Sequence, residues 1–420
     1  MSLVLLVSGL LILLALLGAP LFAIIAASAM WGFYREGIDF QALAIEFYGI
    51  AEMPILLAIP LFTFAGYLLS ASKAPQRLVR LTQALLGWMP AGLAVVSLAV
   101  CALFTAFTGA SGVTIIALGA LLLPALQQAG YPQKFSLGLV TSAGSLGLLF
   151  APSLPLILYG VIAEISVDSL FRAGILPGIV MLVALSGYSV WINRAVRVPL
   201  SDFSWAEVRA AVRESAWEIP LPIVVLGGIY SGYFAISEAA AVTALYVLIV
   251  DMLILREVSW RKLPEIMRES MVLVGGILII LGMSLASTNY MIDAGVPQKL
   301  LALVSQFVSS ELSFLLLLLV FLLILGAILD IFSAIVLVVP LILPVAMQFG
   351  VDPIHLGIVF LATMQLGYLT PPVGLNLFIS SFRFERSIVE VYLSTLPFFV
   401  ILLLSVVLIV FWPWLSLVLV

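Results

Sequence analysis

The segment Gln365–Asn376 reads Gln-Leu-Gly-Tyr-Leu-Thr-Pro-Pro-Val-Gly-Leu-Asn and interrupts a long apolar stretch. Proline removes a backbone donor and clashes with the preceding helical turn, so two consecutive prolines break a helix that enters this segment. A similar interruption comes earlier, where Ser142–Pro155 reads Ser-Ala-Gly-Ser-Leu-Gly-Leu-Leu-Phe-Ala-Pro-Ser-Leu-Pro. Both segments are predicted to be helices that unwind near their middle.

The two interrupted helices belong to an internal repeat, in which Pro152 of the first copy corresponds to Pro372 of the second. A repeat of this length indicates two copies of one structural unit. We call the separation in sequence between these two prolines the repeat offset. It holds without a gap at four places: Leu121–Pro124 with Leu341–Pro344, Gly130 with Gly350, Gly147 with Gly367, and Pro152 with Pro372.

The composition places both copies in a membrane. Of the 420 residues, 64 % are hydrophobic and only 9 % are charged, and the mean hydropathy is +1.30. A soluble domain carries roughly 25 % charged residues. One cysteine and one histidine exclude an internal disulfide and a zinc cluster, and a net charge of −4 provides no basic surface for nucleic acid. The chain is therefore predicted to be an all-α polytopic membrane protein.

Two apolar stretches, 90–127 and 312–348, are too long for one crossing and too short for two. Each has a polar or glycine-rich centre, Gly109–Gly112 in the first and Asp330–Ser333 in the second. We expect both to be re-entrant hairpins, with full crossings near 3–30, 53–71, 135–160, 173–193, 219–236, 239–255, 267–289, 355–381 and 391–418. Two amphipathic segments, near Pro75–Trp88 and after Ser204, are expected to lie at the membrane surface or to pack on the protein as ordinary loop helices.

The distribution of Lys and Arg gives the orientation, because cytoplasmic loops are enriched in these residues. With a cytoplasmic N-terminus and a periplasmic C-terminus, only Arg35, Arg172 and Lys299 lie outside. The residues inside are Lys73, Arg77, Arg80, Lys134, Arg194, Arg197, Arg209, Arg213, Arg256, Arg261, Lys262, Arg268, Arg383 and Arg386. The connector after the first hairpin then lies inside and its equivalent after the second lies outside, so the two copies are inverted.

Inverted repeats with broken helices are typical of secondary transporters, in which the substrate binds near the midplane between the copies. We divide the chain into scaffold 1–89, transport repeat 90–198, scaffold 199–310 and transport repeat 311–420. An intramembrane enzyme would need a catalytic constellation at depth, and the sequence offers none. A channel is also disfavoured, because Asp330 alone makes no ring of charges.

Candidate substrate contacts are hydroxyls at the first hairpin and groups at the starts of two half-helices, which we expect to begin at Pro152 and Pro372. Free N–H groups and a positive dipole at such helix starts suit an anion. Ser111 is either an N-cap, a ligand contact or both, and Asn376 is a candidate for orienting the substrate. The set is Thr108, Ser111, Thr114, Ser153, Pro155, Gly374 and Asn376.

Candidate sodium ligands are oxygens at the hairpin tips and at the unwound segments, since hard cations prefer oxygen. Asp330 has three interpretations: ion coordination, N-capping and proton coupling, because a carboxylate at mid-depth is costly and usually functional. The set is Gly109, Ser111, Gly144, Ser145, Gly147, Gly326, Asp330, Gly367 and Thr370.

These features resemble the large membrane subunit (DctM-like) of tripartite ATP-independent periplasmic (TRAP) transporters, within the wider ion-transporter superfamily. The matching stretches are Leu121–Ile175 and Gly326–Phe378, with the Asp-Pro-Ile-His-Leu-Gly connector and the Leu-Thr-Pro-Pro-Val-Gly-Leu-Asn break. The family usually has Gly-Ser-Ser where this chain has Gly109-Ala110-Ser111, and Pro-Pro-Ser where it has Ala151-Pro152-Ser153. Ala110 has no side-chain oxygen that could bind a sodium ion, whereas its backbone carbonyl is still available as a ligand.

The resemblance implies sodium-driven symport of an organic acid across the bacterial inner membrane, with Na⁺ as the coupling ion and no other cofactor. It also implies an elevator-type movement, in which the hairpins and broken helices slide against a scaffold built from the remaining spans. It implies two partners, a periplasmic substrate-binding protein and a separate small membrane subunit of about four spans. Sialic acid, C4-dicarboxylates, keto acids and sugar acids all fit a site of backbone dipoles and hydroxyls. A stand-alone sodium-coupled carboxylate symporter is the alternative.

Overall fold

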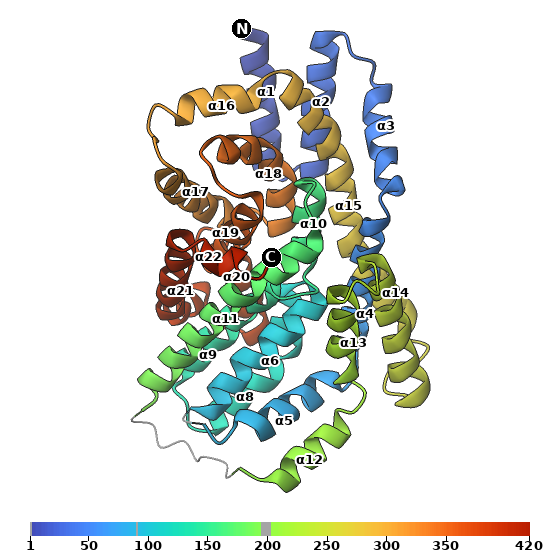
Figure 1. The fold of residues 1–420 in the computed structure, drawn as a ribbon, viewed down its shortest axis with the longest axis vertical. Helices are drawn as coiled ribbons and strands as arrows, with labels where there is room; N and C mark the ends of the chain where they lie inside the picture. Colours follow the sequence, from blue (N-terminus) through green and yellow to red (C-terminus); the bar gives the residue numbers. More distant parts are fainter. Residues whose placement is uncertain (1, 90, 195–202) are drawn as a thin grey trace.

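The structure is a computed structural model that describes residues 2–89, 91–194 and 203–420. The described residues form helices and connecting turns (Figure 1). Arg197, which the charge distribution placed inside, lies outside the described residues.

Two groups of helices make up the molecule, and we call them the frame and the bundle. The frame contains α1 Ser2–Leu16, α2 Leu21–Glu36, α3 Gln41–Gly49, α4 Ala58–Ala71, α5 Ala74–Leu86, α13 Pro220–Tyr230, α14 Ile236–Leu248, α15 Leu263–Asp293 and α16 Val296–Val304. Short turns η1 Ile50–Glu52 and η2 Pro54–Leu57 precede α4, and a π-helical segment, η4 Ile249–Ile254, extends α14. Helix α12, Trp205–Glu214, follows the first bundle repeat.

The bundle contains two hairpins and two broken helices. Hairpin 1 is α6 Gly92–Thr108 with α7 Ser111–Ala117 and α8 Gly119–Gln128; α9 Gln133–Ala143, η3 Leu146–Leu149, α10 Leu154–Ile162 and α11 Val167–Ile192 follow it. Hairpin 2 is α17 Glu311–Gly326 with α18 Ile331–Gln348; α19 Pro353–Gly367, α20 Leu375–Phe384, α21 Ile388–Phe411 and the short α22 Trp414–Leu417 follow it.

The predicted breaks and hairpins are confirmed. The chain turns at Gly109, which has φ +66°, a value that glycine adopts without a steric cost. Helices α9 and α10 are bent by 43° at the first break, and hairpin 1 is itself bent by 49° between α7 and α8. At the far end of hairpin 2, Phe314 at its start stacks on Phe349 at its end, with ring centroids 5.1 Å apart. The second hairpin therefore returns to the side from which it came.

The repeat offset extends to the secondary structure. Helix α7 begins at Ser111 and α18 at Ile331; α9 begins at Gln133 and α19 at Pro353. In the frame the same offset relates α4 to the second half of α15 and the amphipathic α5 to α16. The repeat therefore covers the frame as well as the bundle.

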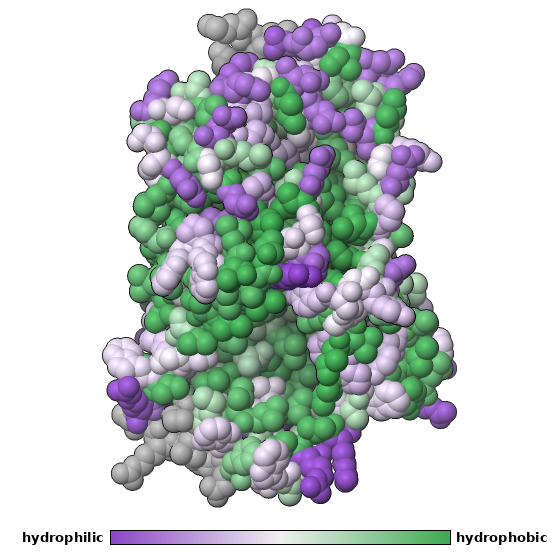
Figure 2. Space-filling model, viewed as in Figure 1, coloured by the Kyte–Doolittle hydropathy of each residue, from purple (hydrophilic) through white to green (hydrophobic). Residues whose placement is uncertain are grey.

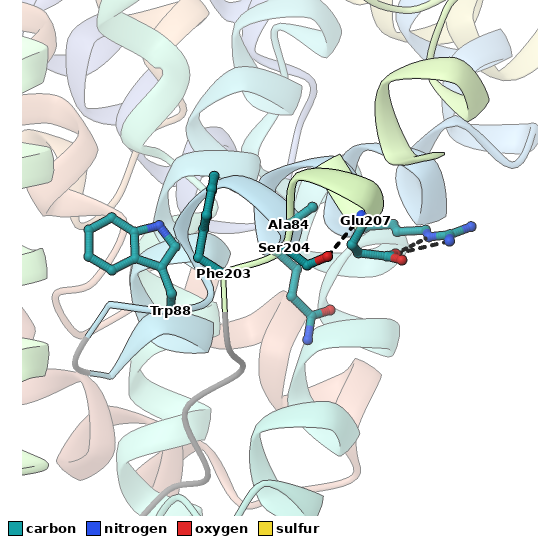
Figure 3. Close-up of a pocket in the computed structure, with 7 residues that line it drawn as sticks. Ala84, Trp88, Phe203, Ser204 and Glu207 are labelled. Carbon is teal, nitrogen blue, oxygen red and sulfur yellow. Dashed lines mark hydrogen bonds and ion pairs between the residues drawn. The ribbon is translucent and has the colours of Figure 1, made fainter. Parts of the chain in front are cut away.

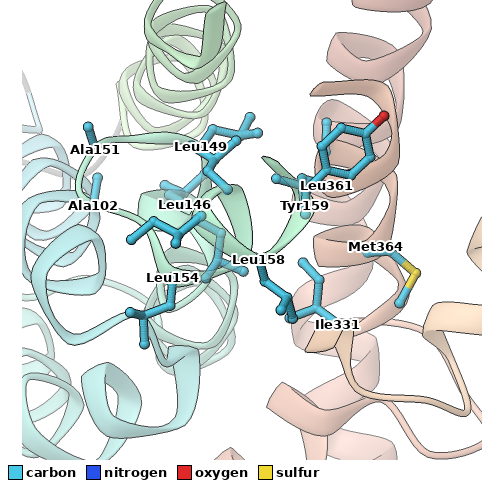
Figure 4. Packing of buried hydrophobic residues seen from close by; sticks show 14 of the residues in the cluster. Ala102, Leu146, Leu149, Ala151, Leu154, Leu158, Tyr159, Ile331, Leu361 and Met364 are labelled. Atoms are coloured by element: carbon cyan, nitrogen blue, oxygen red, sulfur yellow. The ribbon is translucent and has the colours of Figure 1, made fainter. Parts of the chain in front are cut away.

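The two bundle repeats pack against each other through buried apolar side chains. Figure 4 shows Leu146, Leu149 and Leu154 from the first repeat on one side and Ile331, Leu361 and Met364 from the second on the other. All six are at most 2 % exposed. Tyr159 joins the two repeats directly, because its hydroxyl donates to the carbonyl of Pro353 at 2.8 Å. The bundle is therefore one packed body built from both halves of the chain.

The surface is that of a membrane protein. Figure 2 shows apolar residues over most of the visible face, with hydrophilic residues gathered mainly toward the two ends. Among the described residues, six helices are long and apolar enough to cross a membrane, or eight if each bent pair counts as one span.

The predicted crossing at 3–30 is wrong. The chain turns between Leu17 and Pro20, and α1 and α2 lie side by side in opposite directions (Figure 1). Pro20 precedes α2 and Gly18 has φ +86°, so a tight turn replaces a continuous helix. The start of the chain and the Arg35 end of α2 therefore lie at the same end of a helical hairpin.

Three other boundaries differ from the sequence-based expectation. Helices α3 and α16 occupy segments that we expected to be connectors. The last crossing ends at Phe411 because Pro413 interrupts it, and α22 turns back so that Ser416 Oγ lies 3.1 Å from His355 Nδ1. The helices expected at Pro75–Trp88 and after Ser204 are present as α5 and α12.

Candidate functional site

Hairpin 1 and the first break lie against each other. An added Cβ on Gly144 would approach Ile115 to 2.5 Å and the Ser111 carbonyl oxygen to 3.3 Å. An added Cβ on Gly147 would approach the Ala102 carbonyl oxygen to 2.2 Å. Only residues without side chains allow the unwound segment to come this close to the hairpin. The structure thus brings Ser111, Gly144 and Gly147 together.

A hydroxyl network joins the two arms of hairpin 1 to this break. Thr105 Oγ1 donates to the Gly144 carbonyl at 2.9 Å and lies 2.7 Å from Thr114 Oγ1. Both threonines are 0 % exposed. Thr114, expected as a substrate contact, is therefore bonded within the hairpin, where it positions the arm rather than facing an open cavity.

At the tip of hairpin 1, helix α7 begins without a side-chain cap. Ala110 occupies the N-cap position of α7, and no side chain caps this helix start. Ser111 is the first helical residue and is 4 % exposed, so the N-cap interpretation of Ser111 is wrong. Its hydroxyl therefore does not cap α7. Thr108 Oγ1 makes one long contact, 3.5 Å, to the Ala110 carbonyl.

Hairpin 2 and the second break meet in the same way. An added Cβ on Gly367 would lie 2.5 Å from the Cα of Gly326, so the two backbones touch. The Ala327 carbonyl accepts hydrogen bonds from Val373 N at 3.1 Å and Gly374 N at 3.2 Å. Gly326, Gly367 and Gly374 are therefore brought together, as expected for the second copy of the site.

Asp330 is the N-cap of α18. Its Oδ1 accepts from Phe332 N at 2.9 Å and Ser333 N at 3.0 Å, and its Oδ2 accepts from Ser333 Oγ at 2.5 Å. An aspartate in this position satisfies free N–H groups and its charge is favoured by the helix dipole. The N-capping interpretation is confirmed, and it leaves lone pairs on both oxygens available for another ligand.

Asp330 also faces the frame. A cavity of about 210 Å³ separates the tip of hairpin 2 from α15, and its lining includes Asp330, Ser333, Gly276 and Ile280. The carboxylate therefore lies at the boundary between the frame and the bundle.

Backbone carbonyls within both breaks accept hydrogen bonds from nearby residues of the same break. The Ser145 and Gly147 carbonyls accept from Leu148 N at 3.2 Å and Phe150 N at 3.0 Å, as parts of the tight turn η3. Gly367 accepts from Thr370 N at 3.0 Å, and Thr370 Oγ1 donates to Leu366 at 2.9 Å. Short i to i+3 hydrogen bonds thus replace the α-helical ones at these carbonyls. Each carbonyl keeps a second lone pair.

The half-helices begin later than expected, at Leu154 and Leu375 rather than at Pro152 and Pro372. In the second, the Val373 and Gly374 N–H groups bond to hairpin 2, so they are not free for an anion. In the first, Ser153 Oγ donates to the Leu148 carbonyl at 2.6 Å, and Pro155 is buried in the first turn of α10. Ser153 and Pro155 thus shape the break.

The two copies meet at Asn376. Its Nδ2 donates to the Thr141 carbonyl at 3.3 Å, and Thr141 Oγ1 donates to Ser380 Oγ at 2.9 Å. All three side chains are 0 % exposed. Within the part of the chain that the structure describes, Asn376 Oδ1 and Ser142 Oγ are buried polar atoms without a hydrogen-bond partner. Such atoms are costly unless a ligand satisfies them.

The sequence predicts a role for Asn376 but not for Thr141 or Ser380. Both are hydroxyl residues within helices, and the sequence contains no local pattern that brings them together. Arg383 was assigned only to a loop, yet its Nε donates to the Ile116 carbonyl at 3.3 Å. That carbonyl lies at the bend between α7 and α8, so Arg383 links α20 of the second repeat to hairpin 1 of the first.

A larger cavity lies away from these residues, between α5 and α12. It measures about 290 Å³, and its lining includes Trp88, Phe203, Ser204 and Glu207 (Figure 3). Arg80 bonds to Glu207 at 2.9 Å and pairs with Glu214. Because these ion pairs are exposed, they contribute little to the free energy of unfolding. The cavity lies between two surface helices, and its lining residues do not belong to the contact between the two repeats.

The base of α5 is anchored by a buried ion-pair cluster. Arg77 donates to Glu218 Oε1 at 2.8 Å and to Glu257 Oε1 at 2.5 Å, and its side chain is 7 % exposed. Burial alone would lower the pKa of Arg77, but the two carboxylates raise it above its usual value. Burial alone would raise the pKa of Glu257, whereas hydrogen bonds from Arg77 and from Lys73 N hold it below the usual 4.5.

The comparisons with known proteins agree with this arrangement. Residues 5–415 match the family model described as the DctM component of the tripartite ATP-independent periplasmic transporter. The chain belongs to this family. The C4-dicarboxylate TRAP transporter large permease protein DctM of Pseudomonas aeruginosa is 32 % identical over 378 residues, which cover 90 % of this chain and 88 % of that protein.

Two further comparisons show the breadth of the likeness. The ectoine/5-hydroxyectoine TRAP transporter large permease protein UehC of Ruegeria pomeroyi is 30 % identical, covering 97 % of this chain and 96 % of that protein. The crystal structure of the Alcanivorax borkumensis YdaH transporter matches with a TM-score of 0.61 at 16 % identity, over 89 % of this chain and 88 % of that one. That structure is evidence for the fold alone.

Family membership confirms several expectations. This DctM-family chain is a multi-pass membrane component of a transporter and not an enzyme, because its relatives are transporter permeases. It belongs to a family whose large permease works with a small membrane subunit and a periplasmic binding protein. The predicted fold class, an all-α inverted repeat with two hairpins and two broken helices, agrees with the structure.

Proposed function

We propose that this chain carries a small organic acid across the bacterial inner membrane by symport with sodium, receiving it from a periplasmic binding protein and working with a separate small membrane subunit. One observation carries the proposal. Each unwound segment lies against its own hairpin tip, and the two copies meet through Asn376 and Thr141 at 3.3 Å. Paired sites of this kind at the centre of inverted repeats suit a substrate together with its coupling ions.

The assignment of sodium rests on the chemistry of the oxygens. In the first copy the Gly144 backbone lies against the Ser111 carbonyl, and Thr105 donates to the Gly144 carbonyl. In the second copy Gly367 of the break touches Gly326 of hairpin 2, and Asp330 caps α18 at the tip of the same hairpin. Carbonyl, hydroxyl and carboxylate oxygens are the ligands of hard cations. Asp330 supplies the one formal negative charge among the candidate ligands. The proposed Na⁺ sites are therefore one at each hairpin tip.

The assignment of an organic acid rests on the polar groups between the copies and on the relatives. Asn376 Oδ1 and Ser142 Oγ are buried and unpaired among the described residues, and this supports a role for them in binding a polar solute. The names of the relatives include a C4-dicarboxylate and ectoine or 5-hydroxyectoine. We propose a C4-dicarboxylate as the first substrate to test, with sialic acid as the second.

The test is uptake of radiolabelled succinate by proteoliposomes that contain this chain and the small subunit, with the binding protein added outside. Uptake is expected only with an inward sodium gradient, and replacement of sodium by choline should abolish it. Uptake without the binding protein would support the stand-alone symporter instead. Flux that ignores the sodium gradient would contradict the proposal.

A further inference from the structure

An apolar pocket of about 230 Å³ lies between the frame and the bundle, next to the ion-pair cluster that anchors α5. The frame lines one side of it from α4, α5 and α13, with Leu78 and Leu221 among the lining residues. Hairpin 1 lines the other side from α6, with Leu103 and Phe107. Among the described residues that line the pocket, Glu218 is the one with a polar side chain. The pocket is therefore an apolar slot with a single carboxylate.

One side of the pocket is open to the membrane. Ile223 on α13 is 66 % exposed and Leu103 on α6 is 37 % exposed. The opposite wall is closed, because Phe104 and Leu221 are buried. Helix α6 packs on α4 and α5, whereas α13 packs on α14, so the space between α6 and α13 is left to the pocket. A molecule that enters between the two exposed side chains comes from the lipid rather than from water.

Glu218 has an unsatisfied oxygen in this apolar setting. Its side chain is 6 % exposed, and its Oε1 accepts from Arg77 Nε at 2.8 Å. Its Oε2 is a buried atom without a hydrogen-bond partner among the residues that the structure describes. A carboxylate oxygen in that state is costly. An ordered water would find few other polar partners, since the remaining lining side chains are apolar. The pocket therefore favours a ligand that brings its own donor to Glu218.

The charges around Glu218 decide which kind of donor fits. Arg77 is shared between Glu218 and Glu257. Asp251 lies near all three, is 1 % exposed, and has no hydrogen-bond partner for either carboxylate oxygen within the described ranges. Lys73 donates to Glu257 through its backbone N–H, and its side chain is exposed. One buried guanidinium thus faces three carboxylates, an arrangement that attracts a cationic donor and repels an anion.

The position of the pocket agrees with a lipid ligand. Trp217, which precedes Glu218, is 39 % exposed, and tryptophan is enriched at the membrane–water interface. The charge distribution assigns this end of the frame to the cytoplasmic side. From Glu218 the lining extends to Ile223 on α13 and to Phe107 on α6, close to the tip of hairpin 1. Glu218 therefore lies at the level of the headgroups in the cytoplasmic leaflet, and the apolar walls lie at the level of the acyl chains.

We propose that this pocket binds one phospholipid with a primary ammonium headgroup, such as phosphatidylethanolamine. The ammonium group donates to Glu218 Oε2, and part of one acyl chain lies between Leu103, Phe107 and Ile223. Phosphatidylcholine carries the positive charge without an N–H donor, and phosphatidylglycerol carries a net negative charge, so both bind more weakly. The acyl chain contacts α6 of the bundle and α13 of the frame together. This site is separate from the proposed substrate and sodium sites and does not depend on them.

Native mass spectrometry tests the site in this chain co-expressed with the small membrane subunit. The purified protein is delipidated in detergent and mixed with equal amounts of phosphatidylethanolamine, phosphatidylcholine and phosphatidylglycerol. We expect one phosphatidylethanolamine to be retained with a preference of about tenfold over phosphatidylglycerol, because hydrogen bonds to charged groups are the stronger ones. Phosphatidylethanolamine should also raise the unfolding temperature most, since a ligand of the native state stabilises it.

Two variants separate the headgroup from the acyl chain. Glu218→Gln keeps an acceptor for Arg77 but removes the charge, and should reduce the preference for phosphatidylethanolamine over phosphatidylglycerol about tenfold. Leu103→Trp fills the pocket from α6 without touching the ion-pair cluster, and should lose the retained lipid. Its matched control is Leu404→Trp on α21, where the native side chain is 64 % exposed. This control should retain the lipid as the wild type does.

Equal retention of the three lipids by the wild type would overturn the proposal. So would a folded Leu103→Trp protein, judged by its thermal unfolding, that retains phosphatidylethanolamine as well as Leu404→Trp does. If Glu218→Gln does not fold, the result for Leu103→Trp decides alone. Ile223→Trp fills the pocket from α13 and takes the place of Leu103→Trp if that variant does not fold. Loss of sodium-dependent uptake bears on the proposed symport and not on this site, because lipid retention is measured without transport.

Discussion

At the scale of single residues, Asp330 combines two roles that substitutions can separate. Asp330→Ala removes both the N-cap and the charge, whereas Asp330→Ser keeps an oxygen that can accept from Ser333 N. We expect Asp330→Ala to lose about 1 kcal/mol of stability and Asp330→Ser only a few tenths. Both should raise the sodium concentration for half-maximal uptake by about tenfold, which corresponds to about 1.4 kcal/mol.

The measurements are thermal unfolding in detergent and the sodium dependence of uptake in proteoliposomes. Asp330→Ser is the informative variant because its fold is retained. A wild-type sodium response in this variant would show that the carboxylate only caps α18, and would remove Asp330 from the proposed ion site.

The close approach of Gly367 to Gly326 gives a second residue-scale prediction. A Cβ at position 367 would lie 2.5 Å from the Cα of Gly326, so backbone must move to admit it. Gly367→Ala should destabilise the protein by about 1–3 kcal/mol and reduce uptake, because it pushes hairpin 2 off the second break.

The control for this substitution is Gly187→Ala in α11, where an added Cβ would meet nothing within 4 Å. Replacing glycine by alanine inside a helix should raise stability by about 0.5–1 kcal/mol. Equal unfolding temperatures for the two variants would contradict the account of the Gly326–Gly367 contact.

At the scale of elements, the sequence predicts the breaks and hairpins well because their signals are local. Pro371 and Pro372 cannot continue a helix, and the repeat offset relates one break to the other. The hydrogen bonds inside the breaks could not be predicted, since the turn η3 depends on how Gly147 packs against α6. Likewise, the Thr141–Ser380 bond joins residues far apart in the chain, and no local pattern indicates it.

The ion-pair cluster that joins α5 to the rest of the frame has a predictable pH dependence. The pKa of Glu257 lies below its usual 4.5 in the folded protein, mainly because Arg77 outweighs the effect of burial. A depressed carboxylate pKa adds stability that is present above about pH 4.5 and is lost as the pH falls through the folded pKa. The thermal stability of the purified protein should therefore drop below pH 4.5.

Glu257→Gln is the control for this pH effect. The amide keeps a hydrogen-bond acceptor for Lys73 N but does not titrate. Its unfolding temperature should be lower than that of the wild type at neutral pH and should change less below pH 4.5. An acid response as steep as that of the wild type would assign the effect to another carboxylate.

At the scale of the whole molecule, the charge distribution and the structure disagree about the start of the chain. No Lys or Arg precedes Arg35, so the enrichment of positive charges in cytoplasmic loops does not determine the orientation of α1. Because α1 and α2 are antiparallel, the N-terminus lies on the same side as Arg35 (Figure 1). The inverted repeat agrees. Helix α13, the equivalent of α1, begins just after α12, whose Arg209 and Arg213 were assigned to the cytoplasmic side, so the start of α1 falls on the opposite side. We therefore expect a periplasmic N-terminus rather than a cytoplasmic one.

Labelling of intact cells with a membrane-impermeant maleimide tests this orientation in the Cys101→Ser background. A cysteine added at the N-terminus and Ile38→Cys, just after α2, should both react from outside. Arg209→Cys on α12 should react only after the membrane is permeabilised. If Ile38→Cys reacts from outside while the N-terminal cysteine needs permeabilisation, α1 and α2 form one crossing after all. The symmetry between α1–α2 and α13–α14 would then fail, although the repeat within the bundle would stand.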